Sequence, residues 1–202
     1  MEKLLENILD IEWDMFYSTQ NLGGQASCQQ DKNRFVIMRK AQFLAWDEDS
    51  LCCYFEDLNQ AKKAGGNLIT LKYAYMMKST DPEGYKALEH RLPEISPEKE
   101  KIVDELVDIT IKWCQDFAAR YPRIASMGRV LRSSEDTLFS TSVETYSRGE
   151  LSSYGLSTLG ALKKHYEALR KAGINLHEKT VEREMFLMGV GKLEDIEKRL
   201  NS

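Results

Sequence analysis

Hydrophobic residues recur every three to four positions along most of this 202-residue chain, which is the period of an amphipathic helix. In the first segment the stripe is Leu4, Ile8, Ile11 and Met15. Helices are predicted over residues 2–20, 32–46, 50–63, 68–77, 97–121, 154–172, 175–188 and 192–200, with a short one opening at Pro82. We therefore expect an all-α fold, a compact multi-helix bundle of about seven to eight helices.

The segment 68–77, LITLKYAYMM, fits two patterns. Its apolar residues also alternate with polar or small ones, which is typical of a strand. A lone strand would leave its backbone groups unpaired, and the chain offers no convincing partner strand. Helix is therefore favoured.

The length suits one helical domain over residues 1–202. The stretch 91–97 contains two prolines, Pro93 and Pro97, and is the best candidate for a soft division within it. No internal repeat or low-complexity tract is evident.

Three charged residues occupy positions where the helical period predicts core: Glu12, Arg39 and Lys72. Side chains three and four residues apart share a helix face. The neighbours at that spacing are Ile8, Leu9, Met15 and Phe16 for Glu12; Phe35, Val36, Gln42 and Phe43 for Arg39; and Leu68, Ile69, Tyr75 and Met76 for Lys72. An unpaired buried charge costs several kcal/mol. The pattern therefore predicts a polar cluster inside the helical core.

Two interpretations of this cluster remain open. With Asp57 as a second acid, the charges could form interhelical salt bridges that fix the register of the bundle. Alternatively they line a pocket, in which Glu12 is a candidate acid or base and Arg39 and Lys72 anchor a carboxylate or phosphate. A cavity of about 300 Å³ or more beside them would favour the pocket.

Amide side chains lie near these charges in the sequence. Buried amides need hydrogen-bond partners, and a ligand could be one of them; Asn and Gln are also common at helix ends and turns. The candidate ligand-binding residues are Gln25, Gln29, Gln42, Asn67 and Tyr73, together with Asp57 and the Gly23–Gly24 turn, which can adopt positive φ and offer backbone amides.

Two further features are ambiguous. Cys28 follows the glycine turn and is a candidate ligand-binding or nucleophilic thiol, although a small buried residue is the simpler interpretation. The Ser- and Thr-rich segment 133–158 contains Arg148 and Glu150 on either side of Gly149, a candidate hinge. It is either an anion-binding or lid loop or a solvated connection.

Composition narrows the function classes. The net charge of −4 argues against binding nucleic acid by phosphate neutralisation. No apolar run approaches the roughly 20 residues of a bilayer span. The beginning, MEKLLENILDIEW, lacks the features of a signal peptide, and the four cysteines form no C-x-x-C pair, so a cytoplasmic location with reduced thiols is expected. The three histidines lack ligand spacing, so no metal site is predicted.

Four segments of the chain match the sequence pattern of a known family. They are residues 12–46, YFEDL, GGNLITLKYAYMM and SVETYSRGELSSYG. They include a Gly-Gly-x-Ala-x-Cys-Gln turn and an Arg-Gly-Glu-Leu run. With these motifs the chain resembles the family called domain of unknown function 4125. The family often has Leu where Ser147 stands and Ser where Gly155 stands. The resemblance implies a bacterial, helical, cytoplasmic protein and a possible nucleotidyltransferase-like partner domain, and it implies no reaction.

The sequence therefore supports two hypotheses about the function. The first is a small-molecule site for an anionic or amide-bearing ligand in the N-terminal half. The second is a non-enzymatic helical module that docks a peptide or partner domain, with purely structural charges. Reaction, substrate, cofactor and oligomeric state do not follow from the sequence.

Overall fold

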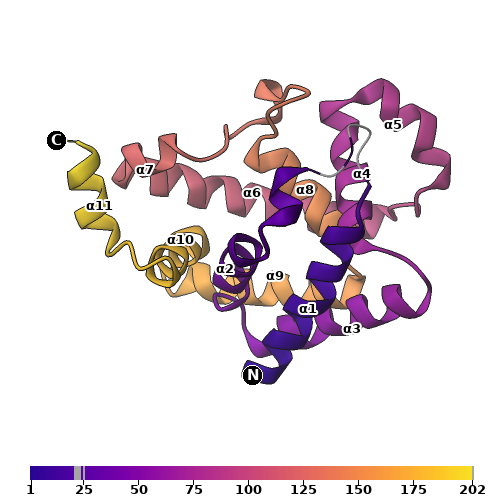
Figure 1. Ribbon diagram of the computed structural model, residues 1–202, viewed down its shortest axis with the longest axis horizontal. Coiled ribbons are helices and arrows are strands. Elements are labelled where there is room, and N and C mark those ends of the chain that lie inside the picture. Colours follow the sequence, from indigo (N-terminus) through magenta and orange to yellow (C-terminus); the bar gives the residue numbers. More distant parts are fainter. Residues whose placement is uncertain (21–23, 25, 202) are drawn as a thin grey trace.

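The computed structural model describes residues 1–20, 24 and 26–201, and this part of the chain forms helices without strands (Figure 1). The α-helices are α1 (Glu2–Ser18), α2 (Lys32–Phe43), α3 (Glu48–Lys63), α4 (Leu68–Thr80), α5 (Pro82–Leu88), α6 (Pro97–Arg120), α7 (Pro122–Ser126), α8 (Val143–Ser153), α9 (Leu156–Lys171), α10 (Leu176–Leu187) and α11 (Leu193–Leu200). Short 3-10 helices are η1 (Ser27–Gln30), η2 (Glu89–Arg91) and η3 (Ser133–Glu135). The all-α prediction is confirmed, with more helices than the seven to eight expected.

Most helices begin at a side chain that satisfies the otherwise unpaired backbone of the first turn. The capping oxygen accepts a hydrogen bond from the backbone N–H three residues further on. The capping residues are Asp31, Asp47, Asn67, Asp81, Ser96, Ser142 and Asn175. Proline occupies the first helical position of α5, α6 and α7, where its missing N–H costs nothing. These local signals explain why most predicted starts agree with the structure to within two residues.

The ambiguous segment after Gly66 is helical. It belongs to α4, which starts at the Asn67 cap and buries Ile69, Lys72 and Met76 on one side. Those positions are three and four residues apart, so Lys72 faces the core together with apolar neighbours. The helix interpretation is confirmed.

The prediction of a loop over 133–158 was wrong for its central part, which is α8. This helix lies between α4 and α6 (Figure 1) and contacts both. Gly149 was expected to be a hinge, but it lies inside α8 where the helix meets α4. A Cβ there would lie 2.5 Å from Met76 Cγ and 2.9 Å from the Lys72 carbonyl oxygen. The missing side chain therefore lets α8 approach the α4 backbone.

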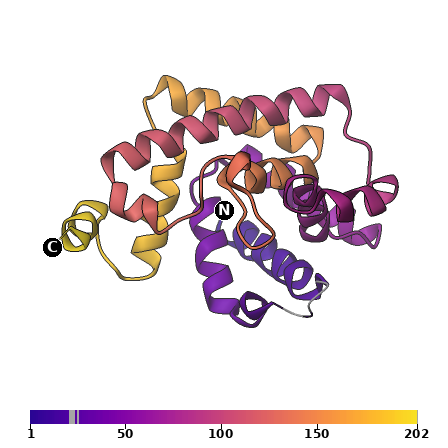
Figure 2. The ribbon, with the colours of Figure 1, turned by 90° about the horizontal axis from the view of Figure 1, so that it is seen from above.

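The main hydrophobic core lies between α1 and α3 on one side and α6, α8 and α9 on the other, with α6 and α9 running alongside each other (Figure 2). Its largest fully buried apolar side chains include Phe43, Leu58, Leu106 and Leu159. A second, smaller core joins the end of α6 to α7 and α11. It consists of Phe117, Tyr121, Ile124, Leu193 and Ile196. The C-terminal helices are thus anchored by their own apolar contacts.

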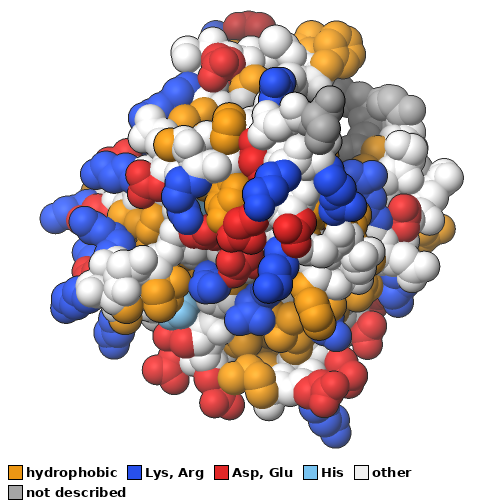
Figure 3. Space-filling model, turned by 90° about the vertical axis from the view of Figure 1, so that its left-hand side faces the viewer, with side chains coloured by type: hydrophobic (Ala, Val, Ile, Leu, Met, Phe, Trp, Pro, Cys, Tyr) orange, Lys and Arg blue, Asp and Glu red, His pale blue; other side chains and the backbone are white. Residues whose placement is uncertain are grey.

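The face of the molecule around α7, α10 and α11 mixes the two signs of charge. Figure 3 shows basic and acidic side chains interspersed over it, with hydrophobic side chains scattered between them. Phosphate backbones are bound by surfaces where basic side chains dominate. This face therefore lacks the electrostatic character of a nucleic-acid interface.

His177 on α10 lies edge-on to Phe117, with ring centroids 5.0 Å apart. Burial lowers its pKa from the usual value to about 4, so the folded protein keeps this imidazole neutral. In the unfolded chain the imidazole of His177 has its ordinary pKa of about 6.5. Below that pH the unfolded state binds more protons, so stability falls as the pH drops from 6.5 towards 4.

We expect His177→Asn to reduce this acid sensitivity by about 2 kcal/mol at pH 5. Urea unfolding of both proteins at pH 5 and pH 7.5 measures the difference. His90→Asn, at an exposed position in η2, is the matched control and should leave the pH dependence unchanged. An unaltered pH dependence in His177→Asn would contradict the assignment.

Candidate functional site

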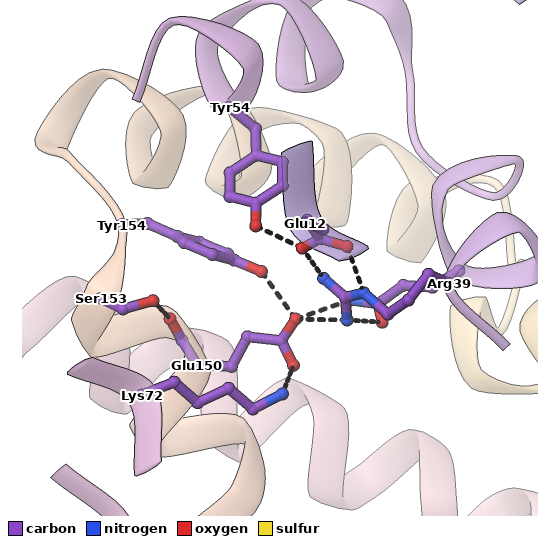
Figure 4. Close-up of polar contacts among 8 residues, drawn as sticks. Glu12, Arg39, Tyr54, Lys72, Glu150, Ser153 and Tyr154 are labelled. Carbon is purple, nitrogen blue, oxygen red and sulfur yellow. Dashed lines mark hydrogen bonds and ion pairs between the residues drawn. The ribbon is translucent and has the colours of Figure 1, made fainter. Parts of the chain in front are cut away.

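Four charged side chains from four helices meet in the interior of the bundle (Figure 4). Glu12 comes from α1, Arg39 from α2, Lys72 from α4 and Glu150 from α8. Their exposed fractions are 0%, 6%, 3% and 7%, respectively. The three charges predicted to be buried are therefore confirmed as buried, and Glu150 joins them as the second acid.

Arg39 is the centre of the cluster. Its Nε donates to Glu12 Oε2 at 2.7 Å and its Nη2 to Glu12 Oε1 at 2.5 Å, so the two groups form a bidentate pair. Its Nη1 donates to Glu150 Oε1 at 2.7 Å and to Gln42 Oε1 at 2.7 Å. Tyr54 donates its hydroxyl proton to Glu12 Oε1. Arg39 thus joins the two carboxylates of the cluster.

Glu150 accepts hydrogen bonds on both oxygens. Oε1 accepts from Arg39, from the Tyr154 hydroxyl at 2.7 Å and from Gln42 Nε2 at 3.3 Å. Oε2 accepts from Lys72 Nζ at 3.0 Å. Two cations and two anions therefore neutralise one another, which is what burial of charge requires.

The pKa values follow from this arrangement. Burial raises the pKa of the Glu150 carboxyl, but the attraction of Arg39 and Lys72 outweighs burial and holds that pKa well below its usual range. Burial lowers the pKa of Lys72, and the opposing attraction of Glu150 raises it above its ordinary value. Both groups are therefore charged at neutral pH.

A pocket opens beside this cluster on the side of Lys72 and Arg39, and we call it the cationic pocket. Its volume is about 160 Å³. The described residues that line it are Phe16, Cys28, Arg34, Phe35, Met38, Arg39, Ile69, Lys72, Tyr73, Arg129 and Tyr146. Four of these carry positive charge, and none of the described lining residues is a carboxylate. Glu12 and Glu150 lie behind this wall.

Two cations of the pocket lie against one aromatic ring. Lys72 Nζ is 3.5 Å from the centroid of the Tyr146 ring, and the Arg129 guanidinium carbon is 4.5 Å from it. Cation–π attraction stabilises each of them. Arg129 also donates to the Thr141 carbonyl at 3.1 Å. Within the described residues, neither Arg129 nor Arg34 has a carboxylate within ion-pair distance. The pocket therefore carries positive charge that the described carboxylates do not pair.

The family model for proteins of unknown function called DUF4125 matches residues 2–198. The chain belongs to this family. Comparison with curated proteins and with solved structures gave no match. The family assignment thus confirms the resemblance and leaves the chemistry to the geometry of the site.

Asp57 is not part of the cluster in this DUF4125 protein. Its Oδ2 accepts from the Gly155 N–H at 2.7 Å and from the Thr158 hydroxyl at 2.6 Å, at the start of α9. A carboxylate at a helix N-terminus satisfies unpaired N–H groups and the helix dipole. The pairing of Asp57 with the buried bases was therefore wrong, and Glu150 takes that position.

The predicted amides divide between the cluster and local structure. Gln42 belongs to the cluster. Gln29 is buried and donates to the carbonyls of Phe16 and Thr19 at 2.7 and 2.8 Å, which ties η1 to the end of α1. Asn67 caps α4 and donates to the Met15 carbonyl at 2.7 Å. Gln29 and Asn67 thus hold the framework of the N-terminal half.

The glycine turn and Cys28 are only partly described. Gly23 and Gln25 lie outside the described residues. Gly24 has a φ of 86°, the left-handed conformation predicted for the turn. Cys28 is exposed in η1 at the cationic pocket, so its interpretation as a small buried residue was wrong. Its place at the pocket leaves it a candidate contact for a ligand.

Tyr73 and Arg148 were both predicted to bind a ligand, and they lie in different parts of the structure. Tyr73 lines the cationic pocket, and burial raises the pKa of its phenol to about 12, so it is a neutral hydrogen-bond donor. Arg148 pairs with Asp104 on α6 at the surface and lines neither this pocket nor the cluster. Of the two, only Tyr73 is placed to contact a ligand.

The sequence did not identify Arg34, Arg129 or Tyr146 as site residues. Tyr146 lies one helical turn before Glu150, a spacing that would have linked them had α8 been recognised as a helix. Arg129 lies in the connection between α7 and η3, where no periodic pattern applies. Its position follows only from the folded chain.

In the described part of the chain no helix is long and apolar enough to cross a membrane. Among the same residues, no His, Cys, Asp and Glu side chains gather into a group that could hold a metal ion.

Proposed function

We propose that this DUF4125 protein binds a small anionic organic ligand, a carboxylate or a phosphate ester, in the cationic pocket. The observation that carries the proposal is the pocket wall, in which Arg34, Arg39, Lys72 and Arg129 face the same space without a described carboxylate. Arg39 and Lys72 are already paired with Glu12 and Glu150, so the charge that a bound anion would neutralise is that of Arg34 and Arg129. Reaction chemistry is not part of this proposal.

Lys72 is the principal anchor. Its ammonium group carries three N–H donors, and Glu150 takes one of them. The Tyr146 ring lies 3.5 Å from Nζ and leaves no room for a ligand between them, so a ligand would reach a remaining N–H from within the cationic pocket. Glu150 pairs with both Lys72 and Arg39, and these ion pairs hold the Lys72 side chain in place. Little conformational entropy of Lys72 is therefore lost when a ligand binds. The buried cluster thus supports the binding surface in addition to stabilising the fold.

The apolar part of the wall selects an organic ligand over a bare ion. Phe16, Phe35, Met38 and Ile69 line the same pocket. At about 160 Å³ the cationic pocket does not reach the 300 Å³ that was expected to favour a ligand site over purely structural charges. Its size suits an anionic head group with a short apolar portion. Glu12 lines no part of the pocket, so we assign it the role of orienting Arg39 in place of an acid or base.

Titration with phenyl phosphate by isothermal calorimetry tests the proposal. We expect saturable binding by the wild-type protein and about a five-fold loss of affinity in Arg129→Gln, because one exposed charge contributes about 1 kcal/mol. The affinity should also fall as ionic strength rises. Inorganic phosphate should bind more weakly than phenyl phosphate, because it cannot use the apolar wall.

Arg91→Gln is the matched control, since Arg91 is also exposed but lies in η2 outside the cationic pocket. Equal losses in Arg91→Gln and Arg129→Gln, or no binding by the folded wild-type protein, would refute the proposal. The second of these results would favour the alternative function, a docking module in which the buried charges are purely structural.

All four cysteines are free thiols, which is compatible with the cytoplasmic location that we propose.

A further inference from the structure

A second pocket lies on the other side of the ion cluster, and we call it the aromatic pocket. Its volume is also about 160 Å³. Helices α2, α6, α8, α9 and α10 contribute to it. The lining residues are Gln42, Trp46, Thr110, Trp113, Tyr146, Ser147, Glu150, Leu151, Tyr154, Tyr166, Leu176, His177 and Thr180. Five Trp and Tyr side chains and a histidine thus belong to the wall of one small space.

The rings of this wall are held by one another. Trp113 and Tyr166 lie with their centroids 4.9 Å apart, and Trp46 and Tyr154 lie 6.1 Å apart. All four residues are less than a tenth exposed. Packed aromatic rings offer a rigid surface on which a planar ligand can stack at low entropic cost.

Polar groups with spare hydrogen-bonding capacity face the same pocket. Among the described residues, no hydrogen bond is found for the Ser147 hydroxyl or for the ring nitrogens of His177. Gln42 Nε2 uses one of its two N–H groups, for Glu150. A neutral imidazole provides one donor and one acceptor. The pocket therefore offers both donors and acceptors from three helices.

The charge of the wall selects a neutral ligand. Glu150 is the only charged residue among the described lining residues, and its oxygens are already occupied by Arg39, Lys72, Tyr154 and Gln42. A cation would meet Arg39 and Lys72 behind that carboxylate. An anion would meet the carboxylate itself. Neither sign of charge finds an unpaired partner there.

We propose that the aromatic pocket is a second binding site, for a neutral six-membered heteroaromatic ring that carries an amide or imide, as in pyrimidines and pyridinecarboxamides. The volume matches one such ring, because a cavity of about 150 Å³ in another protein accepts benzene. The amide supplies donors and acceptors for Gln42, Ser147 and His177. This inference does not depend on anion binding in the cationic pocket.

The chain provides an internal reporter for the test. Of its three tryptophans, Trp46 and Trp113 line the aromatic pocket, whereas Trp13 packs against Phe35 and lines neither pocket. Titration of ¹⁵N-labelled protein with nicotinamide or uracil should shift the indole N–H signals of Trp46 and Trp113 and leave that of Trp13 in place. A fragment of this size should saturate with a Kd of about 1 mM.

Ser147→Leu fills the pocket from α8 and should weaken binding of both probes at least roughly ten-fold. Ser157→Leu, at an exposed position on α9, is the matched control and should leave it unchanged. The proposal is overturned if neither probe shifts the two signals, if Ser147→Leu binds like Ser157→Leu, or if cyclohexanecarboxamide binds as well as nicotinamide. Phenyl phosphate binding, measured separately, reports on the cationic pocket alone.

Discussion

Replacement of Glu150 by glutamine should destabilise the protein by about 3–5 kcal/mol, the usual cost of removing one partner from a buried ion pair. Lys72 is 3% exposed, and Glu150 is its only carboxylate within ion-pair distance in the described structure. The substitution keeps the volume of the side chain and removes only its charge. Lys72 must then stay charged without a partner or give up its proton, and both are costly.

Urea unfolding at pH 7 measures the difference. Glu56→Gln, at an exposed position on α3, is the matched control and should change stability by less than about 0.5 kcal/mol. The double variant Lys72→Met, Glu150→Gln should recover part of the loss, because it removes the unpaired cation. A Glu150→Gln protein as stable as the control would show that the cluster contributes little to the fold.

A methyl group at Gly149 should destabilise the protein by about 1–3 kcal/mol, the usual cost of overpacking. The new Cβ would lie 2.9 Å from the Lys72 carbonyl oxygen, which belongs to the backbone of α4 and cannot rotate away. The helices must separate, and Glu150 on the next residue of α8 would move away from Lys72. Helix propensity alone predicts the opposite, a gain of about 1 kcal/mol for Gly→Ala.

Gly160→Ala provides the matched control. Gly160 lies inside α9, and a Cβ there would meet no atom within 4 Å, so this variant should be slightly stabilised. Thermal unfolding of the two variants side by side gives opposite signs if the close approach of α4 and α8 is real. A gain of stability in Gly149→Ala would contradict that packing.

The sequence predicted the helices and the buried charges because both depend on local spacing. Glu12, Arg39 and Lys72 each lie among apolar residues three and four positions away, and each is buried. The starts of α4 and α6 were predicted at residues 68 and 97, where the structure has them, because an Asn or Ser at a helix start acts on its own neighbours. Local physical chemistry was sufficient for these features.

The partner of Lys72 could not be predicted from local spacing. Glu150 is 78 residues away in the chain, on a helix whose Ser, Thr and Gly content resembles that of a loop. One of these small residues, Gly149, is what allows α8 to pack closely against the backbone of α4. Asp57 was assigned to the cluster as its second acid, but its carboxylate accepts hydrogen bonds from Gly155 and Thr158 at the start of α9. Tertiary packing decides between two such acids.

A crystal structure of the protein soaked with selenate tests the anion site most directly, because selenium scatters anomalously and marks the position of the anion. The account predicts an anomalous peak in the cationic pocket, within hydrogen-bond distance, about 3 Å, of Lys72 Nζ or the Arg129 guanidinium group. The peak should be weaker in Arg129→Gln, which lacks one of the cations of the pocket. Peaks at other surface positions with none in this pocket would contradict the account.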